Sequence, residues 1–344
     1  MIDLRNPPSA ISRAAPVRAD RRLAVRGIGA TAIAMAAGSW TKAARSNLPW
    51  PQKPVRIMVQ FGAGSASDLH ARMVAEDLQS FFKQSFVVEN KPGGSGTIAA
   101  SYVAKSAPDG HTLLLTSNTA NSINPFIFKK LPYDPIKDFT PIARLSYMPF
   151  VVLVSAGSPV TNMKELAAYG RANKIAYGYA NATGQVAAST IAAQAGFEAS
   201  AVPYKGTPAA MSDLIGGQFA FMIGDLGSAA GLIASNRVRP IAVITAKRSA
   251  LAPSLPSVAE SLPSSDFDLP TWLGVLGPAG LPASVVQALN ARITSMLMRK
   301  EVAAKLASIG AEPAPASPAE FEAYMREQLD VWRVKVRDAG ITPE

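Results

Sequence analysis

The sequence predicts an α/β protein with two lobes, each containing its own β-sheet. From residue 54 onward, apolar strand-like runs alternate with amphipathic helix-like segments. This pattern favours parallel strands joined by right-handed helical crossovers. The alternation starts a second time at residue 151, and 344 residues are enough for about two domains of ordinary size. We therefore expect a mainly parallel sheet in each lobe.

The first alternation opens with a buried strand and a long helix. The run VRIMVQ (55–60) is apolar for most of its length, and residues 68–83 place their apolar side chains on one stripe of a helix. Ser67 fits the N-cap of that helix, and Asp68 fits its first turn, where a carboxylate meets free N–H groups. We then expect a strand at 86–90, a loop at 91–96, a helix at 97–106, a strand at 112–118 and an irregular stretch at 119–150.

The second alternation has the same character, and helices follow it at the C-terminus. We assign residues 44–150 together with 270–344 to the first lobe, and residues 151–269 to the second. The expected strands are 151–156, 175–180, 200–204, 219–224 and 240–246, the expected helices are 162–173, 184–195 and 208–216, and the C-terminal helical regions are 283–308 and 318–338.

Composition excludes several kinds of site. The chain contains no cysteine, so disulfides, thiolate metal sites, cysteine nucleophiles and a lipid-modified N-terminal cysteine are ruled out. His70 and His111 are the only histidines, which argues against a metal centre built from several of them. Half of the net charge of +10 comes from residues 1–43. Basic runs with interleaved aromatic residues do not occur, so we do not expect nucleic-acid binding.

Residues 1–43 have the three-part layout of an export signal. An arginine-rich stretch is followed by the apolar run GIGATAIAMAAGSW (27–40), and TKA (41–43) then offers small residues for a cleavage site. The apolar run is shorter than the ~20 residues of a membrane span. Arg21-Arg22 resembles a twin-arginine signal, with a Sec signal or an uncleaved anchor as alternatives. We expect export to the periplasm by the twin-arginine route and a mature protein that is not embedded in the membrane.

Four loops that follow predicted strands combine small polar side chains with much exposed backbone. Ligands of open α/β sheets bind outside the carboxyl ends of the strands, and free N–H groups at helix N-termini favour anions. Each loop alone can be an ordinary turn, but four together predict an anion site made largely of main chain. The loops are FGAGSASD (61–68), TSNTANS (116–122), NATGQ (181–185) and YKGTP (204–208).

Two missing motifs narrow the kind of anion. A phosphate-binding P-loop requires a lysine after its second glycine, and no such lysine follows Gly64. A dinucleotide fingerprint requires a third glycine where Ser67 stands. A carboxylate fits the same loops and requires neither motif.

Candidate catalytic groups are few. No G-x-S-x-G nucleophile elbow occurs. His70 lies two residues from Asp68, which is not a facing spacing on a helix, and we interpret it as a surface or groove histidine. His111 follows the turn sequence Pro-Asp-Gly, and we interpret it as a solvated turn residue.

Asp225, Lys205 and Trp272 are three further side chains of interest. Asp225 follows a predicted strand, where it can bind a ligand amine or order water, or else cap the next helix. Lys205 can attract a carboxylate or remain solvated. Trp272 is expected to serve in packing.

Six segments, in order along the chain, resemble the tripartite tricarboxylate transporter substrate-binding receptors, also called Bug proteins. The resemblance runs from about Trp50 to Ile341, and VPYKGTPAAMSDLIGGQ (202–218) is its most specific match. The other segments are WPQKPVRIMVQF (50–61), ENKPGGSGTIAA (89–100), APDGHTLLL (107–115), RPIAVITAKRSALAPSLPSVAES (239–261) and WLGVLGPAGLP (272–282).

This resemblance implies a periplasmic-binding-protein-like fold of type II, the Venus flytrap, with a ligand cleft between the lobes. In that family the ligand carboxylate is held largely by backbone groups and ordered water in the first loop, and the second lobe adds further contacts. The candidate ligand-binding residues are therefore Phe61, Gly62, Ala63, Gly64, Ser65, Ala66, Ser67, Asp68, Ser117, Asn118, Thr183, Gly184, Gln185, Tyr204, Lys205, Gly206 and Asp225.

Two departures from the family pattern bear on the ligand. Gly62-Ala63 stands where the family commonly has a pair of prolines. Gln185 and Ala188 stand where it often has a serine and a histidine at the start of a second-lobe helix. Our hypothesis is that Gln185 hydrogen-bonds an amide or hydroxyl of the ligand.

The expected function is that of an extracytoplasmic receptor, not an enzyme. It would capture a small carboxylate or amino acid and deliver it to the permease subunits of a tripartite tricarboxylate-type transporter. We expect a monomer with no cofactor and no metal. The alternatives are a periplasmic hydrolase that uses Asp225 or His70, and a ligand sensor for a two-component system.

Overall fold

The computed structural model describes residues 50–262, 267–269 and 271–343, and the chain from Trp50 onward forms one compact unit. The predicted export signal, residues 1–43, lies outside the described residues. None of the helices that the structure describes has the length and apolar character needed to cross a membrane.

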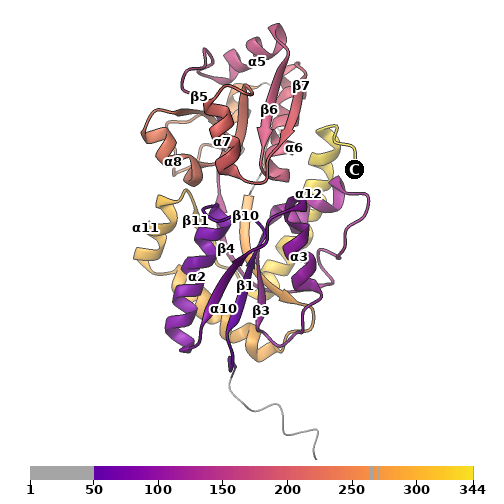
Figure 1. Ribbon diagram of the computed structural model, residues 1–344, viewed down its shortest axis with the longest axis vertical. Coiled ribbons are helices and arrows are strands. Elements are labelled where there is room, and N and C mark those ends of the chain that lie inside the picture. The colour runs from indigo at the N-terminus through magenta and orange to yellow at the C-terminus, as the bar shows by residue number, and fades with distance from the viewer. Residues whose placement is uncertain (1–49, 263–266, 270, 344) are drawn as a thin grey trace, which may run out of the picture. The chain divides into compact units, whose positions relative to one another are not determined.

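The first sheet has strands in the order β11-β4-β10-β3-β1-β2 (Figure 1). The strands β2, β1 and β3 run parallel, whereas β10, β4 and β11 join them through antiparallel pairs. The sheet is therefore mixed. Its strands are β1 (Val55–Val59), β2 (Phe86–Asn90), β3 (Thr112–Ser117), β4 (Phe139–Met148), β10 (Thr271–Pro278) and β11 (Glu312–Pro313).

Helices cover both faces of the first sheet. In β1, Ile57 packs in the cluster shared with α2 and α10, whereas its neighbour Met58 packs in the cluster shared with α3 and α12. A strand that is buried on both faces has a continuous apolar sequence, and this is why residues 55–60 could be predicted as a strand. The helical elements of this half are α2 (Ala66–Phe82), η1 (Gly94–Gly96), α3 (Thr97–Ala104), η2 (Thr119–Ile123), α4 (Asn124–Ile127), α10 (Ala283–Leu297), α11 (Lys300–Ser308) and α12 (Pro318–Asp338).

The second sheet has strands in the order β7-β6-β8-β5-β9. It is mixed as well, since β6 pairs in parallel with β7 and β8, while β5 is antiparallel to β8 and β9. Its strands are β5 (Phe150–Ser155), β6 (Ile175–Tyr179), β7 (Ala199–Pro203), β8 (Phe221–Asp225) and β9 (Val238–Val243), and its helices are α5 (Met163–Ala172), α6 (Ala182–Ala195), α7 (Thr207–Ile215), α8 (Leu226–Ala234) and α9 (Val258–Ser261).

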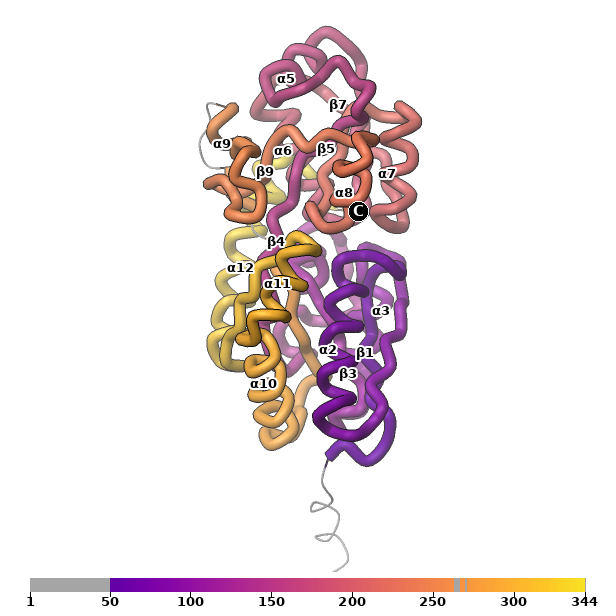
Figure 2. The backbone as a smooth tube through the Cα atoms, turned by 90° about the vertical axis from the view of Figure 1, so that its left-hand side faces the viewer, coloured from indigo at the N-terminus to yellow at the C-terminus, as the bar shows by residue number. Residues whose placement is uncertain are grey.

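The chain passes from one sheet to the other with a single intervening residue. The strand β4 ends at Met148, Pro149 follows, and β5 begins at Phe150. Figure 2 shows β4 leading from the first sheet toward β5 in the second. The predicted α/β class with two lobes is thus confirmed, and most strands of each sheet run in one direction, as expected. The exceptions that make the sheets mixed are β10 and β11 in the first sheet and β5 in the second.

Several elements were not expected. The stretch 119–150 is not irregular, because it contains η2, α4 and the ten-residue strand β4. The strand β10 and the helix α8 were also missed. The glycines of β10 interrupt the apolar pattern by which a strand is recognised. One of them, Gly274, is needed for packing, because a Cβ at this position would overlap the ring of Phe321. Trp272 of the same strand is fully buried against Phe321, as the packing interpretation predicted.

Helix α10 is anchored to α2 by charge. Arg292 donates two hydrogen bonds of 2.7 Å to the buried carboxylate of Asp77, and Arg299 pairs with the same carboxylate. Bidentate arginine–carboxylate pairs fix geometry as well as charge. This anchor returns the C-terminal helices to the first sheet. The lobe boundaries, 44–150 with 270–344 and 151–269, stay a prediction.

Candidate functional site

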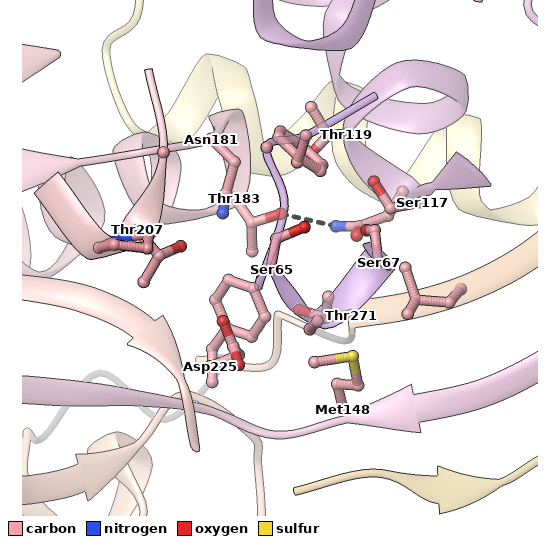
Figure 3. A pocket seen from close by; sticks show the side chains of 18 of the residues that line it. Ser65, Ser67, Ser117, Thr119, Met148, Asn181, Thr183, Thr207, Asp225 and Thr271 are labelled. Carbon is pink, nitrogen blue, oxygen red and sulfur yellow. Dashed lines mark hydrogen bonds between the residues drawn. The ribbon is translucent and has the colours of Figure 1, made fainter. Parts of the chain in front are cut away.

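One pocket lies where strands of both sheets end (Figure 3). It contains about 540 Å³ of space not filled by atoms, part of which is open to solvent. Its lining is neutral except for one carboxylate. The lining residues are Phe61, Gly62, Ala63, Ser65, Ala66, Ser67, Ser117, Asn118, Thr119, Met148, Phe150, Asn181, Thr183, Gly206, Thr207, Pro208, Asp225, Thr271 and Leu273.

The N-terminus of α2 forms one end of the pocket. Its N-cap is Ser65, whose hydroxyl accepts a hydrogen bond from the amide of Asp68, so the predicted cap at Ser67 is wrong by two residues. The helix begins at Ala66, and the amides of Ala66 and Ser67 have no acceptor among the described residues. The first amides of a helix are free donors that carry the positive end of its dipole. They are therefore available to a ligand in the pocket.

Asp68 does not line the pocket. Its Oδ2 accepts hydrogen bonds from the amide of Gly64 (2.9 Å) and from Nε of Arg72 (3.0 Å). Burial opposes ionisation of Asp68, but the bonds from Arg72 and Gly64 outweigh it, so the pKa of this carboxyl lies below its usual value. The bond from Gly64 to Oδ2 of Asp68 holds the loop before α2, while Oδ1 of Asp68 is buried without a partner among the described residues.

Two helices of the second sheet also begin at the pocket. Asn181 caps α6 by accepting a hydrogen bond from the amide of Gly184 (2.9 Å), which leaves the amide of Thr183 without a recorded acceptor among the described residues. Helix α7 begins at Thr207, directly after Gly206. The positive ends of α2, α6 and α7 therefore all meet the same cavity.

A hydrogen bond joins the two halves beside this pocket. Nδ2 of Asn118, at the end of β3, donates to Oγ1 of Thr183 in the first turn of α6 over 2.8 Å (Figure 3). Both side chains are buried. Nearby, Ser117 accepts a hydrogen bond from Gln60 (2.9 Å). The polar ends of these side chains are thus engaged within the protein, although Oδ1 of Asn118 has no protein partner.

Asp225 is the charged residue of the lining, at the N-terminus of α8. Its Oδ1 accepts a hydrogen bond from the amide of Ser228 (2.7 Å), which is the geometry of an N-cap. The residue is 4% exposed, and burial raises the pKa of its carboxyl above the usual value. Asp225 therefore caps α8, which was one of its two predicted interpretations, and it also lines the pocket.

Besides Gly64 and Asp68, four further candidate residues lie outside the lining. Lys205 is exposed, and Tyr204 donates a hydrogen bond from its hydroxyl to Asp213 (2.7 Å). Gln185 is half-buried on α6 but is not among the lining residues. Gly184 also lies outside the lining, since its amide is committed to Asn181.

Several lining residues had not been singled out. Asn181, Thr207 and Pro208 stand inside loops that were recognised, so extending each loop to the helix start would have found them. Thr119 directly follows the candidate pair at the end of β3. No sequence pattern indicated the remaining lining residues, because they lie on strands β4, β5 and β10 where the two sheets meet. They are Met148, Phe150, Thr271 and Leu273.

The two histidines differ from their predicted environments. His70 is fully buried, so the surface interpretation is wrong. Its Nδ1 donates to the carbonyl of Ala66 (2.7 Å), because a carbonyl only accepts, and its Nε2 then accepts from the hydroxyl of Ser146 (2.9 Å). Burial lowers the pKa of His70 to about 4. His111 is partly buried beside Trp50 instead of being solvated.

A close backbone contact lies beside α8. A Cβ on Gly227 would overlap the carbonyl oxygen of Ile309, in the turn after α11. A Cβ on Gly310 would lie 2.7 Å from the amide nitrogen of Gly227. Figure 1 shows α8 and α11 on opposite sides of the boundary between the two sheets. The two halves therefore touch here through main chain.

Among the described residues, no group of three or more metal-ligating side chains is placed to hold an ion. The site thus offers helix N-termini, amides, hydroxyls and one carboxylate. These groups can bind and orient a small polar molecule.

Known proteins share this architecture. A UPF0065 protein of Bordetella bronchiseptica is 36% identical over 296 residues, covering 86% of this chain and 88% of that protein. Among solved structures, R. palustris Rpa4515 with adipate superposes with a TM-score of 0.83 at 33% identity, covering 86% of this chain and all of that one. The periplasmic binding protein BugD gives a TM-score of 0.80 at 30% identity, covering 86% of this chain and all of BugD.

The family model described as tripartite tricarboxylate transporter family receptor matches residues 70–341. Of the solved relatives above, BugD is a periplasmic binding protein, and Rpa4515 was solved with adipate. This chain therefore belongs to the tripartite tricarboxylate transporter receptor family and is a solute-binding receptor, not an enzyme.

Proposed function

We propose that this receptor acts in the periplasm, where it binds a small carboxylated metabolite in the pocket and delivers it to the membrane permease subunits of a tripartite transporter. One observation carries the ligand class. The amides of Ala66 and Ser67, at the start of α2, face a buried pocket and have no acceptor among the described residues. A carboxylate supplies acceptors of the right charge for such a helix end.

The chemistry of the lining supports an anion held by main chain. No lysine, arginine or histidine is among the described lining residues, so the attraction comes from helix ends and hydroxyls. Each helix terminus contributes ~0.3–1 kcal/mol, and up to ~2 kcal/mol when partly buried. Three such ends together contribute about 1–3 kcal/mol to anion binding. The relative Rpa4515, described with adipate, supports the same class.

The lining also narrows the set of candidate residues. We propose that the ligand contacts come from Phe61, Gly62, Ala63, Ser65, Ala66, Ser67, Ser117, Asn118, Thr183, Gly206 and Asp225. Gly64, Asp68 and Gly184 act indirectly, by fixing the loops that present those groups. Tyr204, Lys205 and Gln185 then need not touch the ligand.

Binding is coupled to closure of the two lobes in this proposal. Pro149, between β4 and β5, is a natural place for the rotation because so few residues join the sheets there. The hydrogen bond from Asn118 to Thr183 and the contact of Gly227 with Ile309 would form on closing. We further propose that the protein is monomeric and is exported by the twin-arginine route.

A proline substitution tests the main-chain cradle. Proline is well tolerated at the first position of a helix, where it removes an amide that has no helical partner. Ala66→Pro should therefore preserve α2 and yet raise the Kd for the best-bound acid of a carboxylate panel at least tenfold. Lys300→Pro, at the first position of α11 and away from the pocket, is the matched control and should leave that Kd unchanged.

The panel is screened by thermal shift on the whole chain and checked by titration calorimetry, with each acid compared with its amide. A ligand at about 100 times its Kd stabilises the native state by about 2.7 kcal/mol. Equal shifts for acids and amides, or an unchanged Kd in Ala66→Pro, would argue against a carboxylate held by α2.

A further inference from the structure

Asp225 is the one titratable side chain in the lining of the ligand pocket, among the residues that the structure describes. It lies on the second-sheet side, in register with Phe150 of β5. In the view of Figure 3, Asp225 lies away from Ser117 and Thr119. The neighbouring lining residues are apolar or neutral. Within the described part of the lining, no cation compensates the charge of this carboxylate.

The lining also contains hydrogen-bonding groups that lack partners in the described part of the chain. Oδ1 of Asp225 receives one bond, from Ser228. Oδ1 of Asn118, on the first-sheet side, has no partner among the described residues, and the buried hydroxyl of Thr271, which can donate or accept, has none either. Buried polar groups normally find partners, and each exception calls for one. The acceptors lie in a cavity, so a ligand can supply the missing donors.

At the start of α2, the described part of the pocket contains donors that lack acceptors. The amides of Ala66 and Ser67 are donors without acceptors in the described part of the chain. A ligand that is an acceptor at one end and a cationic donor at the other satisfies both ends at once. A second carboxylate placed near Asp225 would instead meet a like charge without a cation in the lining, which is strongly unfavourable in a buried site.

We propose, building on the carboxylate-binding function above, that Asp225 determines ligand specificity: the receptor prefers carboxylates that also carry an ammonium group, with the carboxylate at α2 and the ammonium at Asp225. Amino acids, in the broad sense of aminocarboxylates, are then the ligand class, and plain dicarboxylates are disfavoured. The pKa of Asp225, raised by burial, indicates a charge that is not yet compensated in the protein alone.

The test uses sets of molecules that differ only at one end. Each set contains an ω-aminocarboxylate, the monocarboxylate and the dicarboxylate of the same carbon number, for example 6-aminohexanoate, hexanoate and adipate. Sets of three to six carbons, together with the α-amino acids, cover different spacings of the two charges. Titration calorimetry on the whole chain at pH 7 gives each Kd.

In the unmodified protein, the tightest set should favour its amino member at least tenfold over both other members. Asp225→Asn should lower the affinity for that amino member at least tenfold and abolish the preference. Asparagine is as good an N-cap as aspartate, so α8 keeps its hydrogen bond from Ser228 and only the charge is removed. Asp225→Glu retains the charge and should retain the preference.

Asp213→Asn is the control, because Asp213 lies on α7 of the same half, bonds to Tyr204 and is outside the lining. It should keep the preference intact. Adipate binding as tight as 6-aminohexanoate, with no change in the ratio in Asp225→Asn, would overturn the role of Asp225 and leave the carboxylate function standing. No binding by any acid of any set would count against both proposals.

Discussion

A buried aspartate lies at the start of a helix at each end of the pocket: Asp68 in the first turn of α2 and Asp225 at the N-cap of α8. The surroundings of the two carboxylates differ in how far they compensate the negative charge. At α2, Asp68 receives bonds from Arg72 and Gly64, and its pKa lies below the usual value because those bonds outweigh its burial. At α8, Asp225 receives one bond from Ser228, and burial raises its pKa. One aspartate holds its loop in place, and the other keeps unused hydrogen-bonding capacity that faces the cavity.

The difference also fixes the sign of each group's pH dependence. A lowered folded pKa means that Asp68 adds stability above its unfolded pKa of 3.8, and that this stability is lost as the pH falls. A raised folded pKa means that Asp225 favours folding below 3.8 and loses this contribution as the pH rises through its folded pKa. At neutral pH, the first group stabilises the protein and the second destabilises it.

The largest expected effect concerns His70, which makes the α2 end sensitive to acid. Its pKa falls from 6.5 to about 4 on folding, so its contribution to stability is present above 6.5 and is lost as the pH falls toward 4. The free energy of unfolding should drop by roughly 3 kcal/mol from this group alone. His70→Gln should be less stable at pH 7 but should lose less on acidification.

Urea unfolding of both proteins at pH 7 and pH 4 measures that difference. The same acid loss in His70→Gln as in the unmodified protein would place the acid sensitivity elsewhere.

The next effect compares one substitution at two places. Asp68→Asn removes charge-assisted hydrogen bonds from a buried carboxylate and should lower the free energy of unfolding by roughly 2 kcal/mol at pH 7. The exposure of the Arg72 side chain keeps this loss moderate. Asp225→Asn removes an uncompensated buried charge and keeps the cap, so stability should be unchanged or higher. Equal losses in urea unfolding would show that the two ends do not differ.

Lobe closure can be disturbed without touching either aspartate. Gly227→Ala inserts a Cβ against the carbonyl of Ile309 and should hold the halves apart at α8, raising the ligand Kd about tenfold, or about 1.4 kcal/mol. Gly231→Ala lies on the same helix with nothing within 4 Å of its Cβ, so it should leave the Kd unchanged. Calorimetry gives the Kd, and small-angle scattering with ligand reports whether the lobes close. Equal affinities in the two variants would rule out this contact as a limit on closing.

The smallest effect belongs to the hydrogen bond between Asn118 and Thr183. A double-mutant cycle with Asn118→Ala and Thr183→Val should give a coupling of about 1 kcal/mol in ligand affinity, the usual worth of one neutral bond. Additive losses would mean that each residue touches the ligand on its own and that the bond between them is incidental to closing.

Strands buried on both faces and helices with clear stripes could be predicted from the sequence. Strand β1 and helix α2 were found within two residues of their ends, because apolar runs and apolar periodicity are local signals. Strands β4 and β10 were missed, since Pro141, Arg144 and the glycines of β10 interrupt the pattern. Their place at the centre of a mixed sheet depends on partners far away in the sequence.

The candidate site likewise combines residues that could be recognised in the sequence with residues that only the fold reveals. The first loop was recognisable because bare backbone between a strand and a helix has few other uses. Lys205 looked equally suitable, but it is exposed and lies outside the lining, and only the fold decides that. Thr271 and Leu273 could not be predicted, because they reach the pocket from a strand that the sequence did not reveal.

The contact between Gly227 and Gly310 has a consequence for how this protein can change over generations. Gly310 has a φ of +69°, where a side chain is strained, and its Cβ would meet the amide nitrogen of Gly227, while a Cβ on Gly227 would meet the carbonyl of Ile309, the residue before Gly310. Neither position can gain a side chain alone while the turn after α11 keeps its path. Among relatives, a larger residue at the position of Gly227 should therefore occur together with a lengthened or displaced turn at the position of Gly310, so that the two sites are inherited as a pair.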